Sequence, residues 1–346
     1  MKLGEGGFGS VVADGKYAVK TFDSTSYMIA EVFATRYVQT LNCPQVISVA
    51  RRNFVNKTIK TERWHGSLQQ AMWRGMTQVQ KRAVFKDILL GLSCLESAYI
   101  IHADMKPSNV FVNEDCTRAT IGDFGISSSS GCARVGWTTP HYSTRAYHNH
   151  RSHDSFSTAL IAMQLFCGYT IGSKDKYPTR TAVRQSIQQK CVDETLRECL
   201  LGLVNDDPRK CWKVEKVLKK LYKIDSPYTK KPLKPEGYLL KDNDSVVCIA
   251  YHLKTLVDKH KFNRPTRCHE CCESIVALTN KDIRLYTAAM AYIFACVFGY
   301  SVKTDKEDRM SEFDVAAYCD CDVLQVVAAV DTILGCVNVV KLMFYM

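Results

Sequence analysis

The chain lacks a hydrophobic run long enough to cross a membrane. Its longest apolar stretch, from Tyr286 to Phe298, is shorter than the ~20 residues that a membrane-spanning helix requires. Two charged residues, Asp331 and Lys341, interrupt the last apolar segment of the chain. The sequence therefore predicts a protein without a membrane partner, and a membrane anchor is the alternative.

A regular cysteine pattern is also absent, although the chain contains 16 cysteines. They are scattered without a disulfide framework, so we expect reduced thiols. The run from Arg267 to Cys272 (Arg-Cys-His-Glu-Cys-Cys) has metal-ligating residues, but no second ligand pair follows at zinc-finger spacing. Packing between helices is the favoured interpretation of this run, and a zinc site is the alternative.

Acidic residues are in deficit: 46 Lys and Arg against 35 Asp and Glu give a formal net charge of +11. Much of the excess lies in residues 209–234. Four lysines there share one face of a predicted helix: Lys213, Lys216, Lys220 and Lys223. Apolar residues lie on another face: Val214, Val217, Leu218 and Leu221. This face is either solvated or a docking surface for an acidic partner or nucleic acid. No motif for binding RNA or DNA accompanies it, so we do not expect a nucleic-acid partner.

The segment with the clearest chemistry is His-Ala-Asp-Met-Lys-Pro-Ser-Asn at residues 102–109, followed by Asp-Phe-Gly at 123–125. Phosphoryl transfer needs a base near the acceptor hydroxyl, cations on the phosphates and oxygen ligands for magnesium. The two segments resemble the catalytic loop and the metal-binding loop of protein kinases. The resemblance implies that Asp104 is the base, that Lys106 is a cation near the γ-phosphate, and that Asn109 and Asp123 bind Mg²⁺.

The amino terminus carries a glycine pattern with Gly4, Gly6, Gly9 and Val11 at G-x-G-x-x-G-x-V spacing. Dinucleotide-binding folds have a similar pattern, but there it opens a helix. Here, Ser-Val-Val and Tyr-Ala-Val-Lys flank an Asp-Gly turn, which predicts a hairpin of two strands. In the kinase resemblance, the glycine backbone covers the phosphates of ATP. Val11 and Ala18 then belong to the nucleotide site, and Lys20 grips the α- and β-phosphates.

Two further segments complete the resemblance in this half of the chain. Residues 27–39 have apolar side chains at helical spacing and one acid, Glu31, which is expected to orient Lys20. A predicted strand then ends at residues 59–64 and resembles the kinase hinge. Thr61 falls at the gatekeeper position, and the backbones of Glu62 and Trp64 are expected to bind the adenine edge of ATP.

The resemblance extends to about residue 225. Lys106 with Pro107 is typical of the serine/threonine class. Thr139 lies in a segment that resembles the one receiving the substrate residue, together with Val135-Gly136, and is expected to bond Asp104 and Lys106. Asp154 resembles the buried aspartate that holds the backbone of the catalytic loop.

Departures from the family pattern are also informative. Ala103 stands where kinases usually have an arginine that pairs with a phosphate on the activation loop. Ala146 and Cys211 stand where a buried Glu–Arg ion pair is usual, so both halves are missing together, which avoids stranding one charge. The segment from Asp123 to Ala146 is short, and its serines, 127–130 before Gly131, are either autophosphorylation sites or plain loop. The residues that the kinase resemblance assigns to phosphate transfer are all present, which favours an active enzyme. They are Lys20, Glu31, Asp104, Lys106, Asn109 and Asp123.

The last third of the chain has a different composition. Residues 226–240 contain three prolines and a glycine among lysines and are predicted to be a linker. Helices are predicted at 244–259, 266–278, 281–298, 311–319 and 322–340. Their lengths weakly resemble a cyclin box, but Ala295 and Val297 or Phe298 replace the Lys and Glu by which cyclins usually grip a kinase helix. The tail is therefore either cyclin-like or a generic helical bundle.

Together these patterns predict an α+β, bilobal protein kinase fold followed by an all-α bundle. The expected domains are a kinase domain at 1–225 (β-rich N-lobe 1–64, helical C-lobe 65–225), the linker, and a helical domain at 241–346. The compact lobes with a fused module resemble virus-encoded kinases. The glycine pattern begins at residue 4, so we expect no signal peptide and an intracellular location, in the cytoplasm or nucleus.

The function expected from the resemblance is that of a serine/threonine kinase that uses ATP and Mg²⁺ on protein substrates. The tail is expected to dock in cis on the helix of Glu31 and to replace activation-loop phosphorylation as the control. The alternative is a catalytically weak or inactive scaffold with a kinase fold. A small-molecule kinase is a minor option, and Thr139-Pro140 in the peptide-receiving segment argues against it.

Overall fold

The computed structural model describes residues 1–39, 42–98, 100–129, 139–144, 150–172, 176–228, 285–286, 288–290, 292–293, 312–319 and 321–335. The chain forms two compact units. One comprises Met1–Thr40, Val49–Thr61 and Pro232–Met346, and the other comprises Leu41–Ser48 and Glu62–Lys231. The predicted helices at 244–259 and 266–278 and the run at 267–272 lie outside the described residues.

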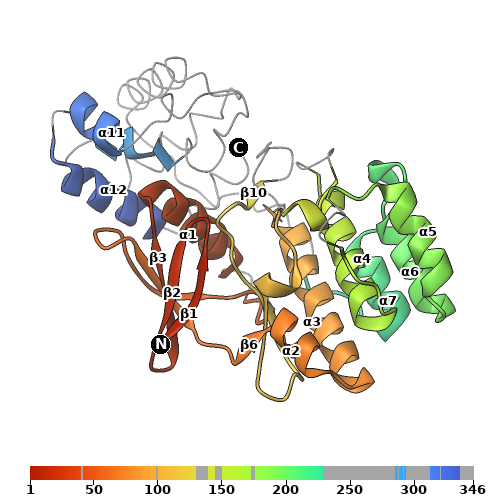
Figure 1. Ribbon diagram of the computed structural model, residues 1–346. Helices are drawn as coiled ribbons and strands as arrows, with labels where there is room; N and C mark the ends of the chain where they lie inside the picture. Colours follow the sequence, from red (N-terminus) through yellow and green to blue (C-terminus); the bar gives the residue numbers. More distant parts are fainter. Residues whose placement is uncertain are drawn as a thin grey trace. The chain divides into compact units, whose positions relative to one another are not determined.

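The first unit is built on a five-stranded sheet with the order β1-β2-β3-β5-β4 (Figure 1). The strands are β1 (Lys2–Gly6), β2 (Gly9–Asp14), β3 (Tyr17–Phe22), β4 (Val49–Asn53) and β5 (Thr58–Glu62). The pairs β1–β2, β2–β3 and β4–β5 are antiparallel. The predicted hairpin with its Asp-Gly turn is therefore confirmed.

Helix α1 (Thr25–Gln39) is buried on every side along its middle, from Met28 to Thr35. A helix that is buried all round must be covered by more than one layer. Helix α1 contacts β3 and β4 on the sheet, and it also contacts α12 (Val323–Gly335) from the far end of the chain. The described tail therefore completes the burial of this helix.

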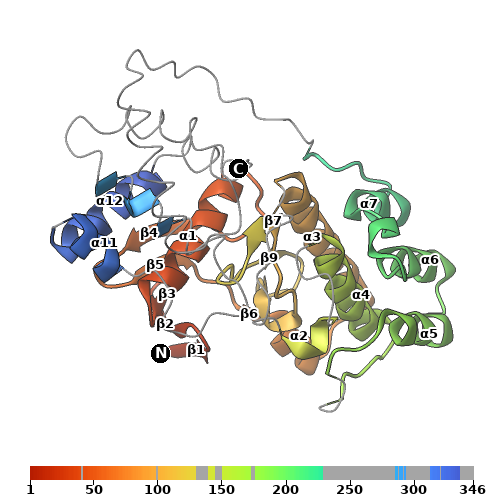
Figure 2. The same ribbon diagram turned by 90° about the horizontal axis from the view of Figure 1, so that it is seen from above.

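Helix α12 and its neighbour α11 (Glu312–Cys319) confirm the last two predicted helices within the described residues. Arg52 of β4 binds Asp331 of α12, with Nε 2.5 Å from Oδ1 and Nη2 3.2 Å from the backbone oxygen. Arg36 of α1 donates to the backbone oxygen of Gly335 over 3.3 Å. Both views show these helices beside the sheet (Figure 1, Figure 2).

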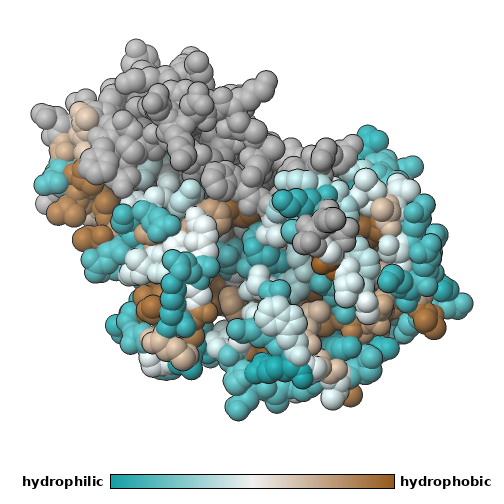
Figure 3. All heavy atoms as spheres, in the orientation of Figure 1, coloured by the Kyte–Doolittle hydropathy of each residue, from teal (hydrophilic) through white to brown (hydrophobic). Residues whose placement is uncertain are grey.

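Few residues of the tail are described before α11, and these are helical. Residues 285–286, 288–290 and 292–293 have helical backbone, and the side chains of Ala288, Met290 and Tyr292 are buried. Hydrophobic side chains also gather over α12 on the face shown in Figure 3. Leu324 of this helix is 58% exposed. That residues 241–346 form a domain of their own stays a prediction.

The second unit is mainly helical and fits the helical lobe expected for a kinase. Its helices are α2 (Leu68–Arg74), α3 (Gln78–Ser97), α4 (Ser152–Phe166), α5 (Arg180–Lys190), α6 (Glu194–Leu203) and α7 (Val214–Tyr222). Three 3₁₀ turns are η1 (Pro107–Asn109), η2 (Pro140–Tyr142) and η3 (Pro208–Lys210). Short strands form the sheets β6-β8-β9 and β7-β10, with β6 (Gly66–Ser67), β7 (Ile100–Ile101), β8 (Val110–Val112), β9 (Ala119–Ile121) and β10 (Ser128–Ser129).

Helices α3 and α4 form the centre of this unit. Helix α3 begins with a capping box in which Thr77 and Gln80 satisfy each other's backbone amides. It also approaches the β9 sheet closely, since a Cβ on Gly91 would lie 2.8 Å from the backbone oxygen of Gln45 and from Cδ1 of Ile121. Helix α4 is buried from Ser152 to Met163, including four polar residues in its first turn. Buried polar groups require partners, and these partners define the candidate site.

Helix α7 is amphipathic as predicted, with Val214, Val217 and Leu218 buried. Its lysines have partners within the chain: Lys216 lies over the ring of Trp212, Lys219 pairs with Asp225, and Lys220 pairs with Glu198. These contacts favour a solvated face over a docking surface for this cluster.

Two expected absences concern the described residues alone. In the part of the chain that the structure describes, no helix combines the length and apolar character of a membrane span, and no three His, Cys, Asp or Glu side chains cluster as a metal site of those residues would require. The described cysteines of the second unit, from Cys43 to Cys211, are thiols rather than disulfides.

Candidate active site

The segment between β7 and β8 carries the side chains with the clearest chemistry. Both strands are anchored in the core, because Ile100, Ile101, Val110 and Val112 are buried. Between them, the chain leaves β7 at residue 102 and enters β8 of another sheet through η1, where Pro107 at the first position needs no amide partner. The loop is thus fixed at both ends.

The carboxylate of Asp154, in the first turn of α4, holds the start of this loop. It accepts the backbone amide of His102 over 2.7 Å and that of Ala103 over 3.0 Å. Burial raises the pKa of Asp154 to about 7, and the two amides act in the opposite direction because they favour the ionised form. Asp154 therefore contacts the backbone of the segment at residues 102–109, as the sequence resemblance predicts.

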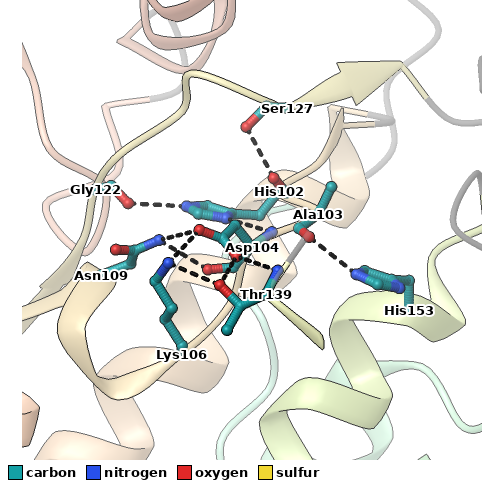
Figure 4. Close-up of polar contacts among 9 residues, drawn as sticks. All are labelled: His102, Ala103, Asp104, Lys106, Asn109, Gly122, Ser127, Thr139 and His153. Carbon is teal, nitrogen blue, oxygen red and sulfur yellow. Dashed lines mark hydrogen bonds and ion pairs between the residues drawn. The ribbon is translucent and has the colours of Figure 1, made fainter. Parts of the chain in front are cut away.

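The backbone at Ala103 is held in a conformation that residues other than glycine seldom adopt. Its φ is +67°, in the left-handed region, which costs on the order of 1 kcal/mol. The ring of His153 contacts the Ala103 oxygen through Nε2 at 2.9 Å, and the hydroxyl of Ser127 donates to the His102 oxygen at 3.2 Å (Figure 4). These bonds fix both peptide groups around the strained residue.

The imidazole of His102 lies buried beneath the loop. Its Nδ1 accepts the amide of Asp104 at 3.3 Å, which leaves Nε2 to carry the proton and to donate to the Gly122 oxygen at 2.9 Å. Burial lowers the pKa of His102, so the ring is neutral. Phe124 packs against it with ring centroids 4.8 Å apart. His102 therefore links the loop to the Asp-Phe-Gly segment.

Four hydrogen bonds converge on the carboxylate of Asp104 (Figure 4). Lys106 Nζ lies 2.6 Å and Asn109 Nδ2 lies 3.0 Å from Oδ2. Thr139 donates to Oδ1 through its amide at 3.1 Å and its hydroxyl at 2.6 Å, and Lys106 also donates to that hydroxyl at 2.8 Å. The structure thus brings together the predicted base, cation and threonine.

The predicted metal ligands Asn109 and Asp123 come from adjacent segments. The amide of Gly122 donates to the Asn109 backbone oxygen at 2.9 Å, which ties the two segments together. The side-chain amide of Asn109 directs its nitrogen to Asp104, at the backbone oxygen (2.9 Å) and at Oδ2. Asp123, the second residue after β9, has a left-handed φ of +65°.

In the first unit, Lys20 of β3 and Glu31 of α1 form the predicted ion pair. Nζ lies 2.6 Å from Oε2, and the side chains are only 15% and 5% exposed. Removing one member of such a buried pair strands the other charge, at a cost of about 3–5 kcal/mol. The position of α1 against the sheet is therefore coupled to the orientation of Lys20.

The register of the β2–β3 hairpin brings the residues predicted to bind the nucleotide to one face of the sheet. Val11 lies opposite Lys20 in the β2–β3 ladder, and Ala18 precedes Lys20 by two residues, so all three side chains share one face. Gly9 has a φ of +143°, and a Cβ there would lie 1.9 Å from the backbone oxygen of Thr21. The structure therefore requires glycine at this position.

The predicted hinge lies at the end of β5. Thr61 is buried, Glu62 is the last residue of the strand, and Trp64 is half-buried in the connection to β6. Val135-Gly136 and Ala146 lie outside the described residues, as do Ser130 and Gly131.

Sequence patterns do not predict one buried cation, Arg180 at the start of α5. Its Nη1 lies 3.4 Å from the sulfur of Cys211, the residue that stands where the family usually has arginine. A guanidinium from another element is thus present beside this position. No local motif marks Arg180, because it binds backbone oxygens and a serine hydroxyl, which any sequence offers.

Comparison with known families decides what the fold is. A model of the protein kinase domain matches residues 1–223, well over half of the chain. The chain belongs to the protein kinase family. Its β-rich and helical units accordingly fit the two lobes of a kinase.

Several animal mitogen-activated protein kinases are similar to part of this kinase. It is 37% identical over 90 residues to the p38b enzyme of Drosophila melanogaster, a match covering 24% of each chain. It is 36% identical over 90 residues to pmk-1 of Caenorhabditis elegans, again 24% of each. Against human mitogen-activated protein kinase 13, the identity is 26% over 126 residues, 35% of this chain and 34% of the relative. The matched part thus spans only about a quarter to a third of these relatives, which support a eukaryotic-type kinase.

Protein kinase domains generally use ATP and Mg²⁺, and the residues of each unit fit these groups. In the second unit, Asn109 turns its nitrogen toward Asp104, which leaves its side-chain oxygen to act as a ligand, and Asp123 supplies a carboxylate from the adjacent segment. In the first unit, a Cβ on Gly4 or Gly6 would meet no atom within 4 Å, so packing does not account for the bare backbone there.

We expect Thr139→Ala to lower the rate of phosphate transfer by the kinase about 10- to 100-fold. The hydroxyl makes hydrogen bonds to Asp104 and Lys106, and bonds to charged groups are worth ~1.5–3 kcal/mol. Thr139→Ser keeps the hydroxyl and should retain most of the activity. Steady-state turnover at saturating ATP measures both. Equal rates for the Ala and Ser variants would show that the hydroxyl has no part in transfer.

We also expect Asp154 to make stability depend on pH. Its pKa rises from 3.8 to about 7 on folding, so the folded state holds a proton that the unfolded state has released. The contribution is complete below pH 3.8 and is lost as the pH rises toward 7. The unfolding free energy of the wild type minus that of Asp154→Asn should therefore fall by up to ~1.4 kcal/mol per pH unit. Urea unfolding between pH 5 and 8 measures the difference, and a constant difference contradicts the expectation.

Proposed function

We propose that this kinase is a serine/threonine protein kinase that transfers the γ-phosphate of ATP to protein hydroxyls. The observation that carries the proposal is the carboxylate of Asp104, which is oriented by Lys106, Asn109 and Thr139 within a loop anchored by Asp154. Such preorganisation is what transfer by positioning and electrostatics requires. Lys106 followed by Pro107 supports the serine/threonine class.

In this proposal, the residues of the second unit handle the acceptor and the transferring group. Asp104 orients the acceptor hydroxyl and takes its proton. Lys106 neutralises charge on the phosphoryl group, and Thr139 helps to place the acceptor. Mg²⁺, held by Asn109 and Asp123, supplies further neutralisation of the phosphate charges.

The first unit binds the nucleotide in this proposal. Lys20, held by Glu31, grips the α- and β-phosphates, and the backbone from Gly4 to Gly9 covers the phosphates. Val11 and Ala18, on the same face as Lys20, line the nucleotide site. The backbones of Glu62 and Trp64 bond the adenine edge.

We also propose that the tail controls the kinase domain in cis and that the protein acts inside the cell. The proposed division is a kinase domain at 1–225, a linker at 226–240 and a helical, cyclin-like module at 241–346. The contacts of α12 with Arg36 and Arg52 support this, because α1 carries Glu31. Ala103, in place of the usual phosphate-binding arginine, agrees with a control other than activation-loop phosphorylation.

Radiolabelled γ-phosphate transfer by the purified chain tests the main proposal, with Asp104→Asn beside the wild type. The purified chain should label itself and generic acidic and basic substrates only when Mg²⁺ is present. The rate of labelling should fall by about 10²–10⁴-fold in Asp104→Asn, because the base is lost. Phosphoamino-acid analysis should show phosphoserine or phosphothreonine.

Two results would contradict the proposal. Phosphotyrosine would refute the class. No labelling by the wild type, while ATP still raises the melting temperature, would favour the scaffold, a kinase fold that binds ATP and partners without transfer.

A charge exchange between Arg52 and Asp331 tests the control in cis. Arg52→Glu and Asp331→Arg each replace an attraction with a repulsion, and each should lower transfer about fivefold if ~1 kcal/mol is lost. The double variant restores opposite charges and should recover most of the rate. The same exchange at Lys60 and Asp14, an exposed pair on the sheet, is the matched control and should have no effect. Unchanged rates in both Arg52 and Asp331 single variants would overturn this part.

A further inference from the structure

Arg180 is an almost fully buried cation that the roles above do not use. It is the first residue of α5, and only 9% of it is exposed. Arginine is seldom buried unless its donors are satisfied, because desolvating a charge is costly. The partners of its guanidinium therefore indicate what the residue does.

One branch of the guanidinium grips the first turn of α4. Nη2 donates to the backbone oxygen of Ser152 at 3.1 Å and to its hydroxyl at 3.2 Å. The guanidinium carbon also lies 5.4 Å from the centre of the Phe156 ring. Ser152 and Phe156 flank His153 and Asp154, the two residues that hold the catalytic loop.

The other branch reaches the connection between α6 and α7. Nη1 donates to the backbone oxygen of Asn205 at 3.2 Å and lies 3.4 Å from the sulfur of Cys211. This connection packs against the centre of the unit, since Cys211 and Val214 are buried. A single planar side chain therefore ties the first turn of α4 to a fixed part of the core.

Electrostatics alone would not favour a cation at this place. The N-terminus of a helix is its positive end, and a cation there is unfavourable by roughly 0.3–1 kcal/mol. A second cation, Arg151, lies at the N-cap of α4, and its Nη2 donates to the Cys211 oxygen at 2.8 Å. Both arginines thus link the start of α4 to other elements through hydrogen bonds to backbone oxygens.

We propose that Arg180 is a positioning residue for phosphate transfer, which holds the first turn of α4 so that Asp154 and His153 fix the catalytic loop. The inference rests on the proposed function for its effect on catalysis. Its structural part, coupling between Arg180 and the loop backbone, stands independently. Arg180 acts through other residues and touches no reacting group.

Arg184, one turn further along α5, provides a matched control. It donates to the backbone oxygens of Leu201 and Val204 and pairs with Asp206, so it also secures the end of α6. None of these partners lies on α4. A residue that matters only for packing the α5–α6 region should therefore behave like Arg184, whereas a positioning residue should not.

The experiment compares Arg180→Met, Arg180→Lys and Arg184→Met in the full chain. Hydrogen exchange of the His102 and Ala103 amides, which Asp154 accepts, reports on the loop directly. Arg180→Met should speed their exchange at least tenfold and lower kcat on the order of 10²-fold, because small misplacements have such effects. KM for ATP should stay unchanged. Arg180→Lys keeps the charge and some donors and should lie between Arg180→Met and the wild type, and Arg184→Met should match the wild type.

Each outcome decides one question. Equal exchange and kcat in Arg180→Met and the wild type, or equal losses in Arg180→Met and Arg184→Met, overturn the positioning role. If Arg180→Met does not fold, the same comparison is made with Arg180→Lys, and wild-type exchange and kcat in that variant overturn the role. A wild type that transfers no phosphate refutes the proposed function instead, while faster amide exchange in the Arg180 variants alone would still support the coupling.

Discussion

The loop that carries Asp104 is held by one buried carboxylate, that of Asp154. Two backbone amides bind it, and between them they set a peptide geometry that includes a left-handed alanine. The geometry of the loop then determines where Asp104 and Asn109 can lie, because few residues separate them from the anchored amides. Asp154 itself sits in the first turn of α4, a helix buried nearly throughout. The geometry of the candidate site is therefore set from a buried helix of the second unit.

Each unit assembles its own share of the candidate machinery. In the first unit, Lys20 and Glu31 are paired in a nearly dry environment, and the burial of α1 requires the tail helix α12 as well as the sheet. In the second, the Asp104 carboxylate is already surrounded by its donors. The side chains are thus oriented by contacts within the protein, so nucleotide binding need not supply the energy to arrange them.

The sequence predicted features that local patterns encode. Alternating residues around Asp14-Gly15 specify a hairpin, and the spacing of apolar residues around Glu31 specifies a helix. The contact of Thr139 with Asp104, between residues far apart in the chain, was predicted from the family resemblance. Arg180 and the Arg52–Asp331 pair were not predictable, because backbone oxygens occur in every sequence and no motif links residues so distant. Ala146 and Cys211 reveal the missing Glu–Arg pair in the sequence, whereas no local pattern predicts the guanidinium of Arg180 beside Cys211.

The discontinuity of the first unit has a consequence for synthesis of the chain. Helix α1 emerges early, but the helix that covers its second side, α12, is encoded after the whole of the second unit. At ~5–20 residues per second, translation leaves that side uncovered for tens of seconds. The nascent sheet unit therefore displays apolar surface while the helical unit folds, which makes this interval the period when chaperones are needed most and when the chain is most prone to aggregate.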